Sequence, residues 1–299
     1  MSAVTVRLES QTVLSGTEWR ARRDAHRRRV DALIGPYLAA RRRGLKHPVI
    51  DFLFTYYSSR PSHVLRWHPG FGITLADADE YLSLRGYERT DDAVSGVRVG
   101  EEYVRRRTDT LESTVALLRA TASRPARLGC FGLHEWAMVY RADETRHDIP
   151  LRLGADGTDR VVESMPLRCT HFDAFRFFTE PARPRNENQL TRSTQIDHEQ
   201  PGCLHATMDL YRYCFGLAPL LPAGLTVDCF EVALRARDLD MRASPYDLRH
   251  LGYDPVPVET PAGRAEYVRE QSAIAEQGSR LRAEVLRRCE ELLEIVSQR

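Results

Sequence analysis

The C-terminal stretch of this chain carries the pattern that most restricts its fold. Between about residues 260 and 297, apolar side chains recur every three or four positions. That spacing places them on one face of an α-helix. We predict one long amphipathic helix whose stripe packs against the body of the chain or against a second copy in a homo-oligomer. The stripe consists of Leu281, Val285, Cys289, Leu292 and Val296.

Helical spacing also predicts the segments 17–43, 47–59, 99–122, 171–179, 203–216 and 223–243. In 142–169, glycines and prolines separate short extended pieces, which is typical of strands. The fold we predict is therefore mainly α, a single helical domain over 1–299 with a few short strands in its middle. Its parts are a basic helix (17–43), a core that bears the motifs (47–253) and a C-terminal amphipathic helix (260–297). The polar stretch 180–200 is either a lid over a substrate or a plain solvated loop.

The charges of the chain nearly cancel, with 43 basic and 42 acidic residues. A formal charge of +1 gives no global attraction to nucleic acid or anionic lipid, so any polyanion site must be local. No long apolar run and no signal sequence are present, which predicts a cytoplasmic protein without a membrane span. The six cysteines are scattered and form no CxxC pair, so we expect reduced thiols rather than a disulfide framework or a zinc ribbon.

Arginines crowd the predicted helix 17–43. Such a run is typical of a solvated helix face, and the alternative is a footprint for phosphates or an acidic partner. Lys46, just beyond this helix, is the single lysine among the 43 basic residues. Either a bias that replaces lysine by arginine has left this lysine by chance, or the protein needs its amine for chemistry.

Histidines and carboxylates recur together on several predicted helices. His47 with Asp51 and His205 with Asp209 are each four residues apart, which places each pair on one helix face. Helical proteins build acid/base sites or metal sites from such side chains, and structural hydrogen bonding is the alternative. The catalytic candidates are Asp51, Glu135, His171, Asp173, His205 and Asp209. A metalloenzyme using iron or zinc would take its ligands from His134, Glu135, His171, Asp173, His205 and Asp209.

Long strings in this chain carry a resemblance to a known family. They are HPVIDFLFTYYSSRPSHVLRWHPG, GCFGLHEWAMVYR, LRCTHFDAFRFFT, EQPGCLHATMDLYRYCF and DLDMRASPYDL. The chain resembles, from Trp19 to its last helix, a family of bacterial proteins that carries the name 3-methyladenine DNA glycosylase. The resemblance implies cleavage of the N-glycosidic bond of an alkylated purine, with DNA as the partner and no cofactor. It assigns no individual catalytic residue.

A glycosylase must hold an extruded purine between aromatic side chains and stabilise positive charge at the sugar with a carboxylate. Asp51 and Glu135 are the preferred carboxylates, because each adjoins histidines and aromatic residues. Phe52 and Phe54 are expected in the core. The candidates for substrate binding are Tyr56, Tyr57, Arg60, Arg66, Trp67, His134 and Trp136.

Burying several polar side chains separately costs more than gathering them where they can pair. We therefore predict that one cavity gathers Asp51, Tyr57, Arg60, Trp67, Glu135, His171 and Asp209. The non-enzymatic alternative is a binding module, in which helix 17–43 and the C-terminal helix dock a partner or a second copy of the chain. The histidines would then only hydrogen-bond with one another in a polar core.

Overall fold

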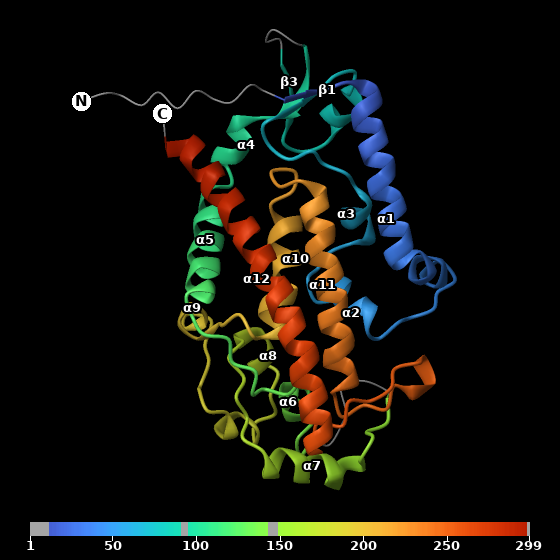
Figure 1. Ribbon diagram of the computed structural model, residues 1–299, viewed down its shortest axis with the longest axis vertical. Coiled ribbons are helices and arrows are strands. Elements are labelled where there is room, and N and C mark those ends of the chain that lie inside the picture. The colour runs from blue at the N-terminus through green and yellow to red at the C-terminus, as the bar shows by residue number, and fades with distance from the viewer. Residues whose placement is uncertain (1–11, 91–94, 143–148, 298–299) are drawn as a thin grey trace, which may run out of the picture.

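Three long helices form the centre of the molecule (Figure 1). The computed structural model describes residues 12–90, 95–142 and 149–297. In it, α10 (Leu204–Gly216) and α11 (Ala223–Arg242) pack side by side, and α12 (Pro261–Ser297) crosses them and also packs against α5 (Thr108–Ala122). The predicted mainly α fold is confirmed.

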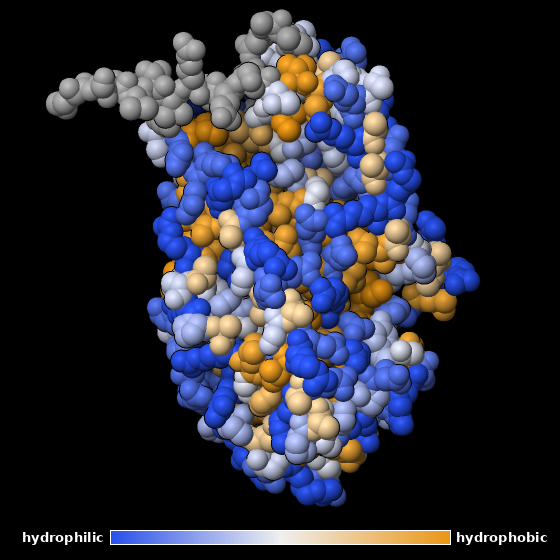
Figure 2. All heavy atoms as spheres, viewed as in Figure 1, coloured by the Kyte–Doolittle hydropathy of each residue, from blue (hydrophilic) through white to orange (hydrophobic). Residues whose placement is uncertain are grey.

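The apolar stripe of α12 faces the molecule's own core. Ile274, Val285, Cys289 and Leu292 are buried, while charged residues occupy the outer side of the helix. The predicted helix 260–297 is therefore confirmed, and its stripe packs against the body of the same chain. On the face shown in Figure 2, hydrophilic side chains cover much of the surface, and patches of hydrophobic ones show between them, including in the region between α1 and α12.

The basic helix predicted at 17–43 is α1 (Gly16–Arg42). Ser15 caps it through a capping box with Glu18, which satisfies backbone groups at its first turn. Trp19 and Val30 lie on its buried face, whereas most of its arginines are exposed. Arg29 reaches across to α11 to pair with acidic side chains there. Much of the arginine run is thus a solvated helix face with some ion pairs.

Several segments are shorter or more broken than predicted. The segment 47–59 contains only α2 (Ile50–Thr55), and α3 (Pro61–Leu65) follows it. The segment 99–122 divides into α4 (Glu101–Arg105) and α5, since the backbone of Arg107 leaves helical geometry. The segment 171–179 holds the single turn α8 (Phe172–Phe175), and 180–200 holds η2 (Arg183–Arg185) and α9 (Gln195–His198). Side-chain spacing predicted these helices but not their ends.

The placement of the strands at 142–169 is wrong for the part that the structure describes. Residues 149–169 contain α7 (Gly154–Ser164) and isolated bridges only, and residues 143–148 lie outside the described chain. Gly154 adopts a positive φ of 64° as the helix begins, and buried Val161 and Val162 hold its inner face against the core. Glycine here starts a helix instead of interrupting a sheet.

The sheet lies instead in the first third of the chain, at the top of Figure 1. Its order is β1 (Thr12–Leu14), β2 (Ile73–Leu75), β4 (Gly96–Val99) and β3 (Tyr87–Thr90), and only β1 and β2 are parallel. The 3₁₀ turn η1 (Asp79–Ser83) precedes β3, and η3 (Arg249–Leu251) precedes α12. Trp19, Trp67 and Tyr81 form a small separate core against this sheet. None of the described helices has both the length and the apolar character needed to span a membrane.

Candidate functional site

A cavity of about 790 Å³ opens between the end of α1, α2, α8 and α6 (Leu133–Ala137). Its wall combines aromatic rings with charged side chains. The functional groups that line it are Arg41, Lys46, Asp51, Phe52, Tyr56, Glu135, Asp173, Phe177, His205, Arg237 and Tyr246. We call this cavity the central pocket. Such a mixture of apolar walls and a few converging polar groups is typical of sites that bind small molecules.

Many of the residues singled out in the sequence meet at the central pocket. Asp51, Glu135, Asp173 and His205 line it, together with Tyr56. Lys46 lines it too, as an exposed residue. Phe54 packs in the core as expected, and Phe52 is partly buried, packs against that core and also lines the pocket. The guanidinium of Arg237 lies 3.9 Å from the centre of the Phe52 ring, which is a cation–π contact.

Arg237 of α11 joins two carboxylates at the wall of the central pocket, which Arg237 and Glu135 both line. Its Nη1 donates to Glu135 Oε1 and to Asp240 Oδ2, each over 2.8 Å. All three side chains are buried. A buried carboxylate is costly unless it is paired, so Arg237 is what permits both acids at this depth.

His134, His205 and Asp240 form the first of two buried triads whose ligand atoms lie within 4.8 Å of one another. His134 Nε2 is 2.8 Å from Asp240 Oδ1. The two atoms touch without the alignment of a regular hydrogen bond, and neither has another partner in the described part of the chain. The ring of His205 lies across that of His134, with centres 4.7 Å apart.

His171, Glu199 and Asp209 form the second triad. His171 Nε2 lies 3.3 Å from Asp209 Oδ2 and 3.7 Å from Glu199 Oε2. Tyr57 donates to Asp209 Oδ1 over 2.8 Å, which fixes the orientation of that carboxylate. The His171 ring stacks on the His205 ring at 5.1 Å, so His205 connects the two triads.

The three histidines differ in their affinity for protons. Burial lowers the pKa of His205 well below its usual range, and the neighbouring His134 and His171 lower it further. Burial also opposes a proton on His134, but the carboxylate of Asp240 outweighs it and raises the pKa of His134 well above its usual range. His205 is therefore a neutral imidazole, and its ring has no hydrogen-bond partner in the described part of the chain. Its lone pair is available at the pocket wall.

The remaining acids at the pocket are held by other groups. Asp51 accepts from the backbone N–H of His47 over 2.7 Å and from Tyr37 over 2.7 Å, and Arg41 pairs with it. His47 and Asp51 thus form a local cap on α2 rather than the expected pair of side chains. Asp173 is bound by arginines, with Arg192 donating to both of its oxygens.

The stretch 180–200 contributes to the site more than a solvated loop would. It supplies Arg192 to Asp173 and Glu199 to the second triad. Gln195 donates to Glu199 Oε2 over 2.8 Å, which orients the buried carboxylate. These contacts anchor the segment at the edge of the central pocket.

Of the seven residues predicted to share one cavity, Asp51 and Glu135 line the central pocket. The other five do not, so the prediction is wrong for most of them. Tyr57, His171 and Asp209 are buried together at the second triad.

Trp67 belongs to the small core near the sheet, and Arg66 lines a different cavity. Arg60 precedes α3 as an exposed residue. Trp136 is fully buried and donates to the carbonyl of Ala243, so its ring is a packing group rather than a pocket wall. Arg60, Arg66 and Trp67 follow α2, after which the chain runs away from the pocket toward the sheet, whereas Trp136 in α6 is turned into the core.

Sequence reasoning missed Arg237, Asp240 and Glu199. The first two are three residues apart in a helix that is otherwise rich in buried apolar side chains. Two opposite charges on the buried face of such a helix are a usable signal, because an apolar face tolerates them only as a pair. Glu199 follows the one-turn helix α9, and nothing in its local sequence pointed to burial.

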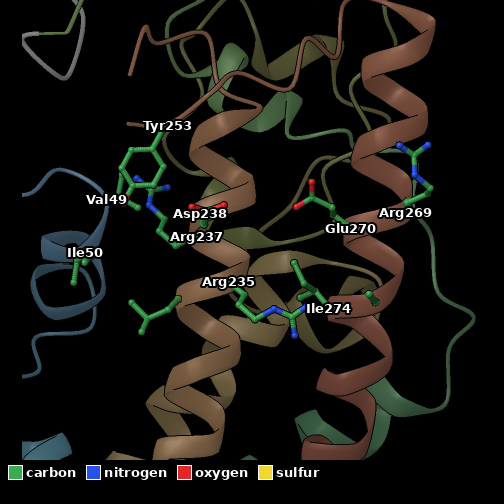
Figure 3. A pocket seen from close by; sticks show the side chains of 11 residues that line it. Val49, Ile50, Arg235, Arg237, Asp238, Tyr253, Arg269, Glu270 and Ile274 are labelled. Atoms are coloured by element: carbon green, nitrogen blue, oxygen red, sulfur yellow. The ribbon is translucent and has the colours of Figure 1, made fainter. Parts of the chain in front are cut away.

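Arg237 also borders a second cavity, of about 540 Å³, between α11 and α12 (Figure 3). Arg235 points from α11 toward α12 there, and Glu270 points back from α12. Glu270 and Asp238 both pair with Arg242, and Arg235 donates to Gln277. The pair of Glu270 with Arg242 and the contact of Arg235 with Gln277 thus join the two helices at this cavity.

Comparison of the chain with protein-family models, with curated proteins and with solved structures gives no match.

Proposed function

We propose that this protein is a metal-dependent enzyme acting on a small molecule in the central pocket. The observation that carries the proposal is the pair of adjacent buried triads, His134 with His205 and Asp240, and His171 with Glu199 and Asp209. His205 belongs to the first triad and to the pocket wall. A metal held by the first triad would lie next to a bound substrate.

The donor set suits a transition metal. Two histidines and one carboxylate are the ligands that non-haem iron enzymes use, and zinc accepts the same donors. His134 Nε2 and Asp240 Oδ1 are buried, close and poorly aligned with each other. A shared cation could bind both atoms, and it would replace the proton that the carboxylate of Asp240 otherwise favours on His134.

Neighbouring groups would orient the ligands. Arg237 binds Asp240 Oδ2 and leaves Oδ1 toward His134. Cys130 Sγ lies 3.5 Å from His134 Nδ1, and Tyr57 holds Asp209 Oδ1. Such outer contacts are characteristic of metal sites, where they fix the ring orientation and the charge of each ligand.

The pocket walls indicate the kind of substrate. Phe52, Tyr56 and Phe177 offer apolar ring surface, while Glu135 and Lys46 offer charge of both signs. A small molecule with a flat apolar part and a polar group fits this arrangement. A metal bound by the triad supplies Lewis acidity or redox chemistry, and the residues of this chain position the substrate against it.

Metal analysis tests the proposal. Protein expressed without added metal and purified without chelator is expected to contain iron or zinc at about one equivalent per occupied triad. His205→Ala and Asp240→Asn should lose the metal of the first triad, while His250→Ala, an exposed histidine, should retain it. Circular dichroism checks that each variant is folded. Metal-free protein that takes up neither Fe²⁺ nor Zn²⁺ on titration contradicts the proposal.

A second candidate function is the excision of an alkylated purine from DNA. Asp51 and Glu135 line the same pocket as the rings of Tyr56 and Phe52, which is the combination that a glycosylase needs. The family resemblance supports it as well. Release of free base from methylated DNA is the assay, with Asp51→Asn and Glu135→Gln as test variants and the exposed Asp197→Asn as control. No release by the original protein rules this function out, and equal release by all variants rules out Asp51 and Glu135 as its carboxylates.

Two further properties remain proposals from the sequence, namely a cytoplasmic location and self-association through α12. The outer face of α12 carries intrahelical ion pairs such as Arg280 with Glu276. A second copy would have to meet this charged face, so association should weaken with salt. Sedimentation at low and high ionic strength tests it.

A further inference from the structure

A third cavity, of about 270 Å³, lies at the C-terminal end of α10 and is rich in positive charge. Among its described lining residues there are arginines and histidines but no carboxylate. We call it the basic cavity. Its side chains with polar or aromatic character are His63, Arg66, His68, Arg85, Tyr103, Arg107, Phe215 and Thr226.

The arginines of the basic cavity lack acidic partners in the described part of the chain. Arg107 donates to the carbonyl of Gly216, and its Nε is buried without a partner there. Arg85 lies over the ring of Tyr103 at 5.7 Å. The guanidinium of Arg66, at an exposed position, makes no hydrogen bond or ion pair within the described residues. Like charges brought together without counter-charge repel each other, so the cavity favours an anion.

Two histidines and an aromatic ring complete the wall. His63 stacks on Phe215 with ring centres 5.8 Å apart. His63 Nδ1 accepts from the backbone N–H of Arg60, which leaves Nε2 as a donor in the neutral ring. His68 is buried, and its Nδ1 lies 3.0 Å from the hydroxyl of Tyr87. The cavity thus offers donors beside flat apolar surface.

We propose that the basic cavity binds a small phosphomonoester. Its phosphate would lie between Arg66, Arg85 and Arg107, because guanidinium groups bind phosphate oxygens through charge-assisted and often paired hydrogen bonds. The non-phosphate part would lie against Phe215 and Tyr103. The volume of about 270 Å³ is many times the roughly 30 Å³ that one water molecule occupies in liquid, which leaves room for a group attached to the phosphate.

This site is separate from the central pocket. His205 near the start of α10 lines the central pocket, and Phe215 near its end lines the basic cavity. Ten helical residues span about 15 Å. The proposal therefore stands without the metal-dependent reaction, and a phosphate here would hold a ligand or a regulator rather than react at the triads.

Calorimetric titration at low ionic strength tests the site, with phenyl phosphate and inorganic phosphate as probes. Phenyl phosphate should bind more tightly, since it adds ring contacts to the phosphate contacts. The double variant Arg66→Gln with Arg85→Gln should bind phenyl phosphate at least about tenfold more weakly. The reason is that each hydrogen bond between a guanidinium and the phosphate contributes to the binding free energy, and the variant loses them. Arg28→Gln on the exposed side of α1 is the matched control and should bind like the original protein.

Three outcomes overturn the proposal. The first is that neither probe binds, and the second is that the double variant binds as well as Arg28→Gln. The third is that a single-stranded oligonucleotide binds through Arg66 and Arg85 while both small probes do not, which would make the surface a nucleic-acid contact. Circular dichroism of the double variant confirms that it is folded before the comparison is made.

Discussion

The carboxylate of Asp240 lies 2.8 Å from Nε2 of His134, although the two residues come from helices far apart in the chain. The contact brings α6 against α11 beneath the central pocket. Arg237 holds the other oxygen of the same carboxylate, so Asp240 is oriented from both sides. The position of this carboxylate leads to predictions for stability as well as for metal binding.

Replacing Arg237 should destabilise the protein strongly. Arg237→Leu leaves Glu135 and Asp240 buried without their common cation, and breaking a buried pair in this way costs about 3–5 kcal/mol. Arg235→Leu removes an exposed arginine from the same helix and should cost far less. Urea unfolding of both variants gives the comparison. Equal stability of the two would show that the buried network contributes little.

Removing metal should lower the thermal stability of the original protein but not of Asp240→Asn. A ligand that binds only the folded state adds about 2.7 kcal/mol to the free energy of unfolding when its concentration is a hundred times its Kd. Differential scanning calorimetry with and without a chelator measures the effect. An equal shift in both proteins would place any bound metal away from Asp240.

The long helices could be predicted because their buried faces follow a clear period. Trp19, Val30 and Ile34 of α1 and the stripe of α12 repeat at helical spacing, and packing keeps that pattern. The sheet could not, since β1 and β2 are three-residue strands whose pairing joins distant parts of the chain. Such short strands are defined by their tertiary neighbours rather than by their own sequence.

The sequence identified the histidines of the candidate site but not their partners. Spacing along a helix pairs His205 with Asp209, whereas in the structure Asp209 contacts His171 and His205 lies between two other rings. The rule for residues four apart describes a single helix face, and it cannot tell which other helix that face meets. Asp240 escaped notice for the same reason, because its partner His134 is remote in sequence.

Acid should destabilise the protein through His68. Burial lowers the pKa of His68 to about 3, with Arg66 adding to the effect. The unfolded chain therefore takes up a proton near the ordinary histidine pKa of about 6.5, whereas the folded protein does not. The stability associated with this group is present above that pH and is lost as the pH falls, at up to about 1.4 kcal/mol per pH unit.

Urea unfolding between neutral and acidic pH measures this dependence. In His68→Gln the free energy of unfolding should depend less steeply on pH, by up to the slope that one bound proton contributes. His250→Gln, at an exposed position, should leave the slope unchanged. An unaltered slope in His68→Gln would mean that His68 is charged in the folded protein.

The crossing of α10 and α12 should depend on the missing side chain of Gly278. A Cβ at this position would lie 2.7 Å from the side chain of Thr207, which is itself fully buried. Gly278→Ala must therefore push the helices apart or displace Thr207, and overpacking of this kind costs about 1–3 kcal/mol.

Gly224 in α11 is the matched control, because a Cβ there meets no heavy atom within 4 Å among the described residues. Gly224→Ala should raise the free energy of unfolding by up to about 1 kcal/mol, through the better helix propensity of alanine. Denaturant unfolding separates the two outcomes, and stabilisation by Gly278→Ala would show that the two helices are not in close contact at this point.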